Sequence, residues 1–599
     1  MNRILIVCYL LLLGFSGFAQ DIDIANQYLK QGEYEKAKLI YQKIIKDKSG
    51  ARFVHENYME CLLKLKNYEE ANKYLKKQIK AEPEAIKYRA EYVFLLEMTN
   101  NNKDSDAEMR ELIEIAAKQE NMAYELQDLF IKKSKYEQTV DLLQKARIYA
   151  KDENKFAILL ARAFLMNGQK DKMLEELLKY GMTEGNIEYV KATIQDNFKS
   201  DDELKILEKG LYTAVQRFPG DAYYVDLLVW YLVQQKDFYK AFVQARALDR
   251  RLKLEGSKVF DLAQTALSNK DYKNAVSMFE YILKEYPHGQ YYSTVRRLSI
   301  YCREELVKNT FPINKTDIVG LINDYQNLFL ELGKNPKTME ALRNTAHLYA
   351  FYLNEKDTAI TILETAIMIA GADNYFRDNC KLDLGDIYLL KNEPWESTLL
   401  YSQVEKSQKE EQLGQEAKLK NAKLQYFQGN FELAKEILDI LKKATTREIA
   451  NDALQLGLLI QDNTGLDSTE TVMKEYAAIE LLFFQNEYNQ ALEKLEKLYQ
   501  ANKFHSLADE MLWLKANALL KLNKTDEVLL ALETIRKNFS TDILADDATY
   551  LEAELYEQKL NDKNKAMELY KEILKNFPGS IYGAEARKKF RQLRGDIVY

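Results

Sequence analysis

The residue types that most often carry chemistry are sparse in this chain. Histidine occurs only four times in 599 residues, at His55, His288, His347 and His505. None of the four has a second histidine or a cysteine three or four residues further on, which is the spacing of a zinc site on one helix. We expect His347 to be a hydrogen-bonded, buried or half-buried side chain, and His288 to be solvated in a turn.

Motifs for nucleophilic catalysis, phosphate binding and calcium binding are also missing. The sequence contains no G-x-S-x-G, no G-x-x-x-x-G-K-[ST] and no G-x-G-x-x-G. The oxygen-rich stretches 100–106 and 462–467 lack a glycine where a calcium loop requires one, so polar loops are the simpler interpretation. The sequence therefore predicts no catalytic, cofactor-binding or metal-binding residues and no cofactor, and it favours a protein that is not an enzyme.

The cysteines do not form a disulfide or metal pattern either. Outside the first twenty residues they are Cys61, Cys302 and Cys380, an odd number of thiols far apart in helix-like contexts. We expect all three to be buried and to act as small apolar side chains.

The first 19 residues read as a signal peptide. Arg3 gives a short positive region, residues 4–18 form an apolar run, and residues 17–19 offer small side chains for a peptidase. An uncleaved N-terminal anchor is the alternative, but the run is short for a membrane helix. Cys8 lies inside the apolar run and not at the cleavage site, which argues against a lipid anchor. No later segment reaches eighteen uninterrupted apolar residues, so we expect an exported, soluble protein without a transmembrane segment.

Composition points to a helical, multi-unit protein that does not bind nucleic acid. The net charge is −7 and the pI about 5.6, whereas nucleic-acid binding favours a basic stripe. Only 7 prolines and 22 glycines interrupt the chain, which favours helices almost throughout. A length of 599 residues exceeds one ordinary core, so several domains or a repeat array must bury the apolar residues.

An internal repeat organises these helices. The segments 32–41 and 66–75 share a sequence motif in which Ala37 and Ala71 are separated by 34 residues. The motif recurs around Ala241 and Ala275 with the same separation. A period of 34 is that of a two-helix repeat. Each alanine is small because the two helices of a hairpin must approach closely at that position.

The sequence resembles the tetratricopeptide repeat family over most of its length. The resemblance rests on a small residue in the second helix, an aromatic three residues earlier, and a closing proline twelve residues later. The matching residues are Ala37, Ala71, Ala241, Ala275, Ala434, Ala491 and Ala566; Tyr34, Tyr68, Phe238, Tyr272, Phe431 and Tyr488; and Pro83, Pro287 and Pro578.

This resemblance implies an all-α fold, a right-handed α-solenoid of thirteen to fifteen helical hairpins, arranged as two arrays in tandem. We expect an N-terminal array over residues 20–307 and a C-terminal array over 338–599. The repeat pattern is interrupted by helix-breaking residues at Pro312, Gly320, Gly333 and Pro336. Residues 308–337 are therefore expected to form an irregular connection with one helix near 317–332. A second break predicts an extra helix near 448–461.

The last repeats show a further resemblance. Residues 538–548 and 576–586 share an aromatic, a turn and a small-residue helix, and residues 285–289 repeat part of the pattern. This is similar to the repeat subtype of bacterial envelope-assembly proteins, and the whole chain, residues 458–467 included, resembles exported tetratricopeptide proteins of Bacteroidetes. The resemblance implies a periplasmic location, with possible outer-membrane association, although the lipid-bearing cysteine of the assembly lipoproteins is missing.

Together these features predict a non-enzymatic scaffold that binds protein or peptide partners on its concave face, in assembly or maintenance of the cell envelope. Exposed tyrosines would suit such contacts. One alternative is a solenoid that binds glycan or peptidoglycan through tyrosines and Trp230, Trp395 and Trp513, although core packing is the stronger account of these tryptophans. An enzyme with a cryptic site is a further alternative, for which the sequence offers no clustered acid, base or metal site.

Overall fold

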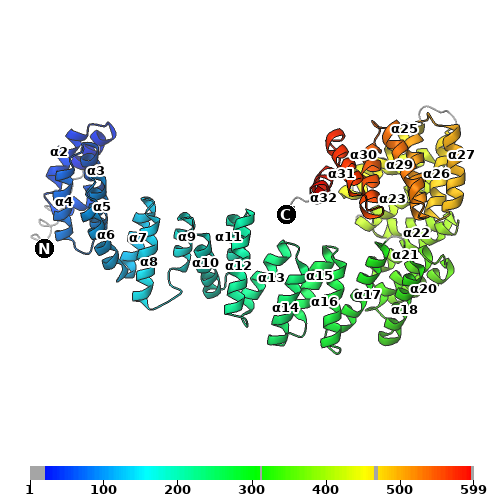
Figure 1. Ribbon diagram of the computed structural model, residues 1–599, viewed down its shortest axis with the longest axis horizontal. Coiled ribbons are helices and arrows are strands. Elements are labelled where there is room, and N and C mark those ends of the chain that lie inside the picture. Colours follow the sequence, from blue (N-terminus) through cyan, green and yellow to red (C-terminus); the bar gives the residue numbers. More distant parts are fainter. Residues whose placement is uncertain (1–19, 311–312, 410, 445, 465–469, 595–599) are drawn as a thin grey trace, which may run out of the picture. The chain divides into compact units, whose positions relative to one another are not determined.

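A computed structural model of the protein describes residues 20–310, 313–409, 411–444, 446–464 and 470–594. Every regular element within these ranges is a helix, which confirms the all-α prediction. The chain divides between Leu252 and Lys253 into two compact units (Figure 1). The expected signal peptide, residues 1–19, lies outside the described residues.

In the first unit, residues 20–30 are helical and are followed by a regular series of helices. These are α2 (Tyr34–Ile44), α3 (Lys48–Lys64), α4 (Tyr68–Ala81), α5 (Ile86–Met98), α6 (Asn102–Ala117), α7 (Glu120–Lys132), α8 (Tyr136–Ala150), α9 (Ala157–Met166), α10 (Lys170–Glu184), α11 (Ile187–Asn197), α12 (Asp201–Arg217), α13 (Ala222–Gln234) and α14 (Phe238–Leu252).

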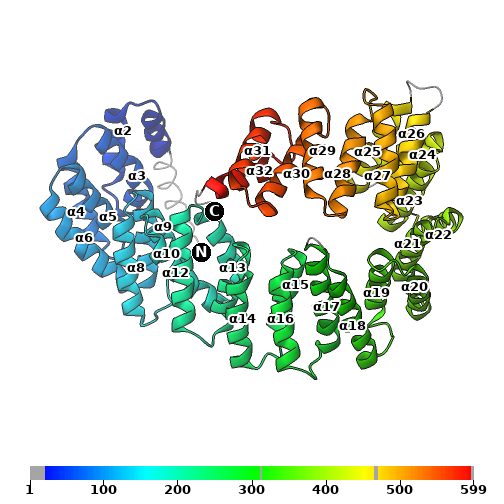
Figure 2. The same ribbon diagram turned by 45° about the vertical axis from the view of Figure 1, so that its right-hand side comes forward.

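The second unit continues the series, and Figure 2 shows its helices from a second side. They are α15 (Ser257–Ser268), α16 (Tyr272–Glu285), α17 (Tyr292–Lys308), α18 (Lys315–Leu332), α19 (Met339–Phe351), α20 (Lys356–Ala370), α21 (Asn374–Leu390), α22 (Pro394–Ser407), α23 (Gln412–Phe427), α24 (Phe431–Ala444), α25 (Arg447–Thr464), α26 (Thr471–Phe484), α27 (Tyr488–Ala501), α28 (Ala508–Lys521), α29 (Thr525–Asn538), α30 (Ala545–Gln558), α31 (Lys563–Asn576) and α32 (Gly583–Arg594).

The helices pair into hairpins, whose first and second members we call the A and B helices. Reading the described helices in order gives fifteen pairs, with α25 and α32 left over, within the expected thirteen to fifteen. The turn between A and B repeats one device: a residue with positive φ stands two positions before the B helix, as at Gly32 and Lys66. This left-handed residue reverses the chain after the A helix.

The residues of the repeat signature lie where the sequence predicted. Each of the six signature aromatics is the first residue of a B helix, as Tyr34 is of α2 and Phe431 of α24. Each of the three prolines lies two residues beyond the end of a B helix, where its missing N–H costs no helical hydrogen bond. All seven signature alanines are fully buried, because the A and B helices approach closely there: Ala37, Ala71, Ala241, Ala275, Ala434, Ala491 and Ala566.

The segment expected to connect two arrays is mostly helical. Residues 315–332 form α18, which packs against both α17 and α19 inside the second unit. The division between the compact units instead lies between Leu252 and Lys253, well before that segment. The expected boundaries of the two arrays, at residues 307 and 338, stay a prediction.

One helix interrupts the alternation in the second unit. α25 covers the position of the expected extra helix and packs on α24, where the A helix of the next hairpin would otherwise lie. The true next A helix, α26, packs against α23 instead. Its C-terminal end folds back further: Leu481 and Phe484 pack beside Leu389, and the Gln485 side-chain amide donates to the Leu389 carbonyl at 2.9 Å.

Candidate binding face on helices α28 and α30

His55 and His347 occupy structural positions, and His288 is exposed. His55 is buried, with Nε2 2.8 Å from a Glu91 carboxylate oxygen and Nδ1 3.2 Å from the Tyr74 hydroxyl. His347 is half-buried, as expected, and its Nε2 lies 3.1 Å from Asp383. Within the described ranges no group of three or more His, Cys, Asp or Glu side chains could hold a metal ion.

The three thiols are buried, as the sequence predicted. Burial raises the pKa of Cys61 to about 11 and the pKa values of Cys302 and Cys380 to about 12. At neutral pH these side chains are therefore thiols and not reactive thiolates.

A partly open face on the last A helices carries the best candidate site. Three consecutive A helices, α26, α28 and α30, repeat with a period of 37 residues, which places Tyr476, Trp513 and Tyr550 at equivalent positions. In α28 and α30 the aromatic is flanked on the same helical face by residues three before and four after it. We call this set the α28–α30 face: Glu510, Trp513, Asn517, Asp547, Tyr550 and Glu554, all of them half-buried.

The B helices cover the side of these helices that adjoins the face. The small residues Ala516 in α28 and Ala553 in α30, three positions after the aromatics, are fully buried against the adjoining B helices. Figure 2 shows α28 to α32, in orange and red, one after another, and each packs on the next. The core thus fixes which side of α28 and α30 can meet a partner.

Tyrosine hydroxyls, and not cations, hydrogen-bond to Asp547 on this face and to Glu480 beside it. Tyr582 donates to Asp547 at 2.7 Å, and its ring stacks on Tyr550 with centroids 4.3 Å apart. On α26, which packs beside α28, Tyr426 donates to Glu480. Within the described part of the chain, Glu480, Glu510, Asp547 and Glu554 form no ion pair with a lysine or arginine.

The protonation of these acids reflects that environment. Burial raises the pKa of Glu480 to about 7, more than the Tyr426 hydrogen bond and the distant Lys423 lower it. Burial, followed by the neighbouring Asp509, raises the pKa of Glu510, and one oxygen of Glu510 is buried without a hydrogen-bond partner. Burial also raises the pKa of Asp547 and of Glu554, against a lowering by Lys589 in the case of Glu554.

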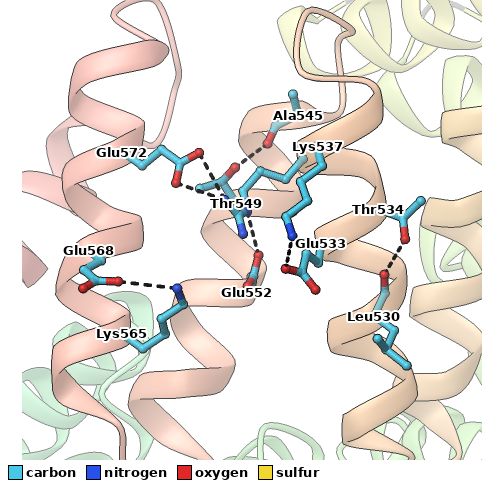
Figure 3. A network of polar contacts seen from close by, with 11 residues as sticks. Leu530, Glu533, Thr534, Lys537, Ala545, Thr549, Glu552, Lys565, Glu568 and Glu572 are labelled. Carbon is cyan, nitrogen blue, oxygen red and sulfur yellow. Dashed lines mark hydrogen bonds and ion pairs between the residues drawn. The ribbon is translucent and has the colours of Figure 1, made fainter.

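A contrasting arrangement lies on the other side of α30. Arg536 of α29 donates to Glu552 of α30 at 3.0 Å and to Glu572 of α31 at 3.2 Å, and Glu552 is almost fully buried. Figure 3 shows the two carboxylates converging from neighbouring helices. This network ties three consecutive helices together and is structural.

The tryptophans differ from one another. Trp230 and Trp513 are half-buried, in line with helix packing, but Trp395 at the start of α22 is 81% exposed, so core packing is wrong for Trp395. In the stretch 100–106, Asn101 donates to Asp104 at 2.8 Å at the start of α6. Of the stretch 462–467, residues 465–467 lie outside the described residues.

Sequence reasoning missed the α28–α30 face, although part of its signal was available. The period of 37 in residues 476–554 aligns the aromatics and acids without any structure. The pairing of these acids with tyrosines from other helices could not be read from that alignment, because the partners lie 35 and 54 residues away.

The comparisons with known proteins agree with this architecture. The tetratricopeptide repeat family profile matches residues 23–47 and 547–580, the first and last full hairpin regions. No curated protein sequence matches the chain. No helix in the described ranges has both the length and the apolar character needed to cross a membrane.

Solved structures show low similarity to this chain. A tetratricopeptide repeat protein from Parabacteroides merdae matches at 10% identity and a TM-score of 0.27, over 49% of this chain and 97% of that one. A Naa15/Naa10 complex bound to HypK matches at 14% identity and a TM-score of 0.25, over 96% of this chain and 91% of that one. The Cut9–Hcn1 complex of the APC/C matches at 13% identity and a TM-score of 0.24, over 86% of this chain and 98% of that one. No conclusion rests on likenesses of this size. The protein is therefore an all-α array of helical hairpins in which residues 23–47 and 547–580 match the tetratricopeptide repeat.

Proposed function

We propose that the protein is a non-enzymatic scaffold that binds protein partners on the A-helix side of its second unit. The observation that carries the proposal is the α28–α30 face, where aromatic and acidic side chains repeat in register on successive helices. Half-buried aromatic rings bury a large area on binding at a low cost in side-chain entropy, so they make good contact residues.

The architecture supports the same proposal. A helical hairpin cannot shelter its own apolar face, so hairpins stack and leave one extended side of A helices for partners. Part of that side is already occupied within this chain, because α26 packs on α23 and its end covers Leu389. The α28–α30 face lies beyond that fold-back and remains half-exposed.

We further propose that the protein is exported and works in the periplasm, in assembly or maintenance of the cell envelope. What supports this is the signal-like character of residues 1–19 and the resemblance of residues 538–548 and 576–586 to repeats of envelope proteins. Fusion of residues 1–40 to a reporter enzyme that is active only outside the cytoplasm tests export. An inactive reporter would remove the periplasm from the proposal.

Site-specific photo-crosslinking tests the binding function. A photoreactive amino acid at Asn517, between Trp513 and the end of α28, should capture protein partners in cells that express the full chain. The same amino acid at Leu530, 64% exposed on the B helix of that hairpin, is the matched control. We expect crosslinked protein only from position 517.

Equal crosslinking from positions 517 and 530 would contradict a binding role for the A-helix side. Sedimentation of the purified protein with peptidoglycan, lost when Trp395 is replaced by alanine, would instead support the glycan-binding alternative, because Trp395 is the tryptophan that the structure leaves exposed.

A further inference from the structure

The acidic side chains of the α28–α30 face are the property that identifies a partner. The face carries Glu510, Asp547 and Glu554, and within the described residues no lysine or arginine forms an ion pair with any of them. A carboxylate oxygen of Glu510 is buried without a donor. Acids that are partly desolvated and lack a cation gain most from a partner that supplies one.

The aromatic residues favour the same kind of partner. Trp513 and Tyr550 lie one helical turn from Glu510 and Asp547 and present half-buried rings beside the acids. A lysine or arginine placed over such a ring is attracted to its electron-rich face while its charge meets the neighbouring carboxylate. An acidic partner would meet only repulsion at this face.

The chain itself contains a pairing of a lysine with an acid that also binds a tyrosine, close to this face. The last helix, α32, contains five basic residues between 587 and 594 and packs against α31. Its Lys589 reaches back to α30, where the ammonium lies 3.0 Å from Glu557, and Glu557 also accepts a hydrogen bond from Tyr570 at 2.7 Å. A tyrosine-bound acid of α30 thus already accepts a lysine from a basic segment.

We propose that the α28–α30 face binds a lysine- or arginine-rich segment of a partner protein. This inference rests on the proposed scaffold function and names the chemistry of its partner. The partner's cations would pair with Glu510, Asp547 and Glu554, and their aliphatic stems would lie on Trp513 and Tyr550. A segment in extended conformation can reach both helices in succession.

The test measures binding of a fluorescein-labelled (Lys-Thr)6 peptide to the full chain by fluorescence anisotropy, with (Glu-Thr)6 as the charge-reversed control. The variant Glu510→Gln with Glu554→Gln removes two carboxyl groups from the face. The matched control, Glu493→Gln with Glu533→Gln, removes two charges from exposed positions on the neighbouring B helices α27 and α29.

We expect the dissociation constant of (Lys-Thr)6 to rise at least tenfold in the face variant and less than twofold in the control variant. The emission of Trp513 should shift on binding, and Trp513→Phe should abolish that shift. Equal affinities of the two double variants, or equal binding of (Glu-Thr)6, would overturn the proposal.

Two measurements keep the outcome interpretable. The single variants Glu510→Gln and Glu554→Gln should each weaken binding about threefold, so that the result does not depend on the folding of one double variant. Crosslinking from position 517 separates the two proposals. If wild type and the face variant capture a partner equally, the scaffold function is supported and binding through a basic segment is contradicted.

Discussion

Two buried or half-buried acids in the second unit show how differently one fold can treat a carboxylate. Asp383 on α21 lies against Arg343 and His347 of α19, whereas Glu480 on α26 accepts a hydrogen bond from Tyr426 and forms no ion pair among the described residues. Burial alone would raise both pKa values. His347 and Arg343 outweigh it and hold the pKa of Asp383 at about 2, while the pKa of Glu480 rises to about 7.

The difference separates structural pairs from available charge. Two acids are paired with a cation inside the protein: Asp383 with Arg343, and Glu552 with Arg536. Each pair links neighbouring helices. Among the described residues Glu510, Asp547 and Glu554 form no such ion pair, although Lys589 lowers the pKa of Glu554, and these carboxyl groups remain available to a partner. We expect removal of a cation from the first kind of pair to destabilise, and removal of an acid of the second kind to stabilise.

Replacement of Arg536 by methionine should produce the largest effect. Glu552 would remain almost fully buried without its cation, and breaking a buried pair in this way costs about 3–5 kcal/mol. Urea unfolding, combined with hydrogen exchange of α29 to α31, measures the loss. A stability unchanged from wild type would show that Arg536 is dispensable and that the two kinds of acid do not differ.

Replacement of Glu480 by glutamine should act in the opposite direction. In the folded state Glu480 keeps its proton up to about pH 7, whereas the usual glutamate pKa is near 4.5, so ionisation opposes folding as the pH rises from about 4.5 to 7. Well above pH 7 the variant should be more stable by about 3 kcal/mol. Thermal unfolding at pH 8 and at pH 4.5 tests this, because the gain should disappear at the lower pH.

Asp383 should give the reverse pH dependence. Its folded pKa of about 2 lies below the usual aspartate value of 3.8, so its contribution is fully present above about pH 4 and is lost as the pH falls toward 2. Replacement by asparagine should cost about 2 kcal/mol at pH 7 and nothing near pH 2. A cost that stays constant from pH 7 to pH 2 would mean that the asparagine variant is unstable for reasons other than lost charge.

The exposed pair Glu493–Lys497 on α27 should show the smallest effect. Both side chains are more than two-thirds exposed, and exposed ion pairs contribute little after screening and loss of side-chain entropy. Glu493→Gln should leave the melting temperature unchanged within error. A clear drop would indicate that exposure, the property that separates this pair from the Arg536 network, does not govern the strength of these pairs.

Much of the architecture could be predicted from the sequence, because the signals are local. Tyr34 and Phe431 begin B helices, and Ala37 and Ala434 are fully buried, since a small residue at that position is a direct requirement of two closely packed helices. The division of the chain into compact units could not be predicted from such local signals. The breakers near Pro312 mark a local irregularity, but α18 still packs on both neighbours, and compactness depends on such packing.

The sequence by itself determined the hairpins, their turns and the alignment of Trp513 with Tyr550, because all of these follow from periods along one chain. Only the tertiary structure decided where the acids find partners. The extra helix α25 takes the place beside α24, so α26 packs on α23 and brings Glu480 to Tyr426, 54 residues away. Whether a carboxylate meets a cation or a hydroxyl depends on such contacts between helices. A periodic pattern along the sequence does not specify which distant helices come into contact.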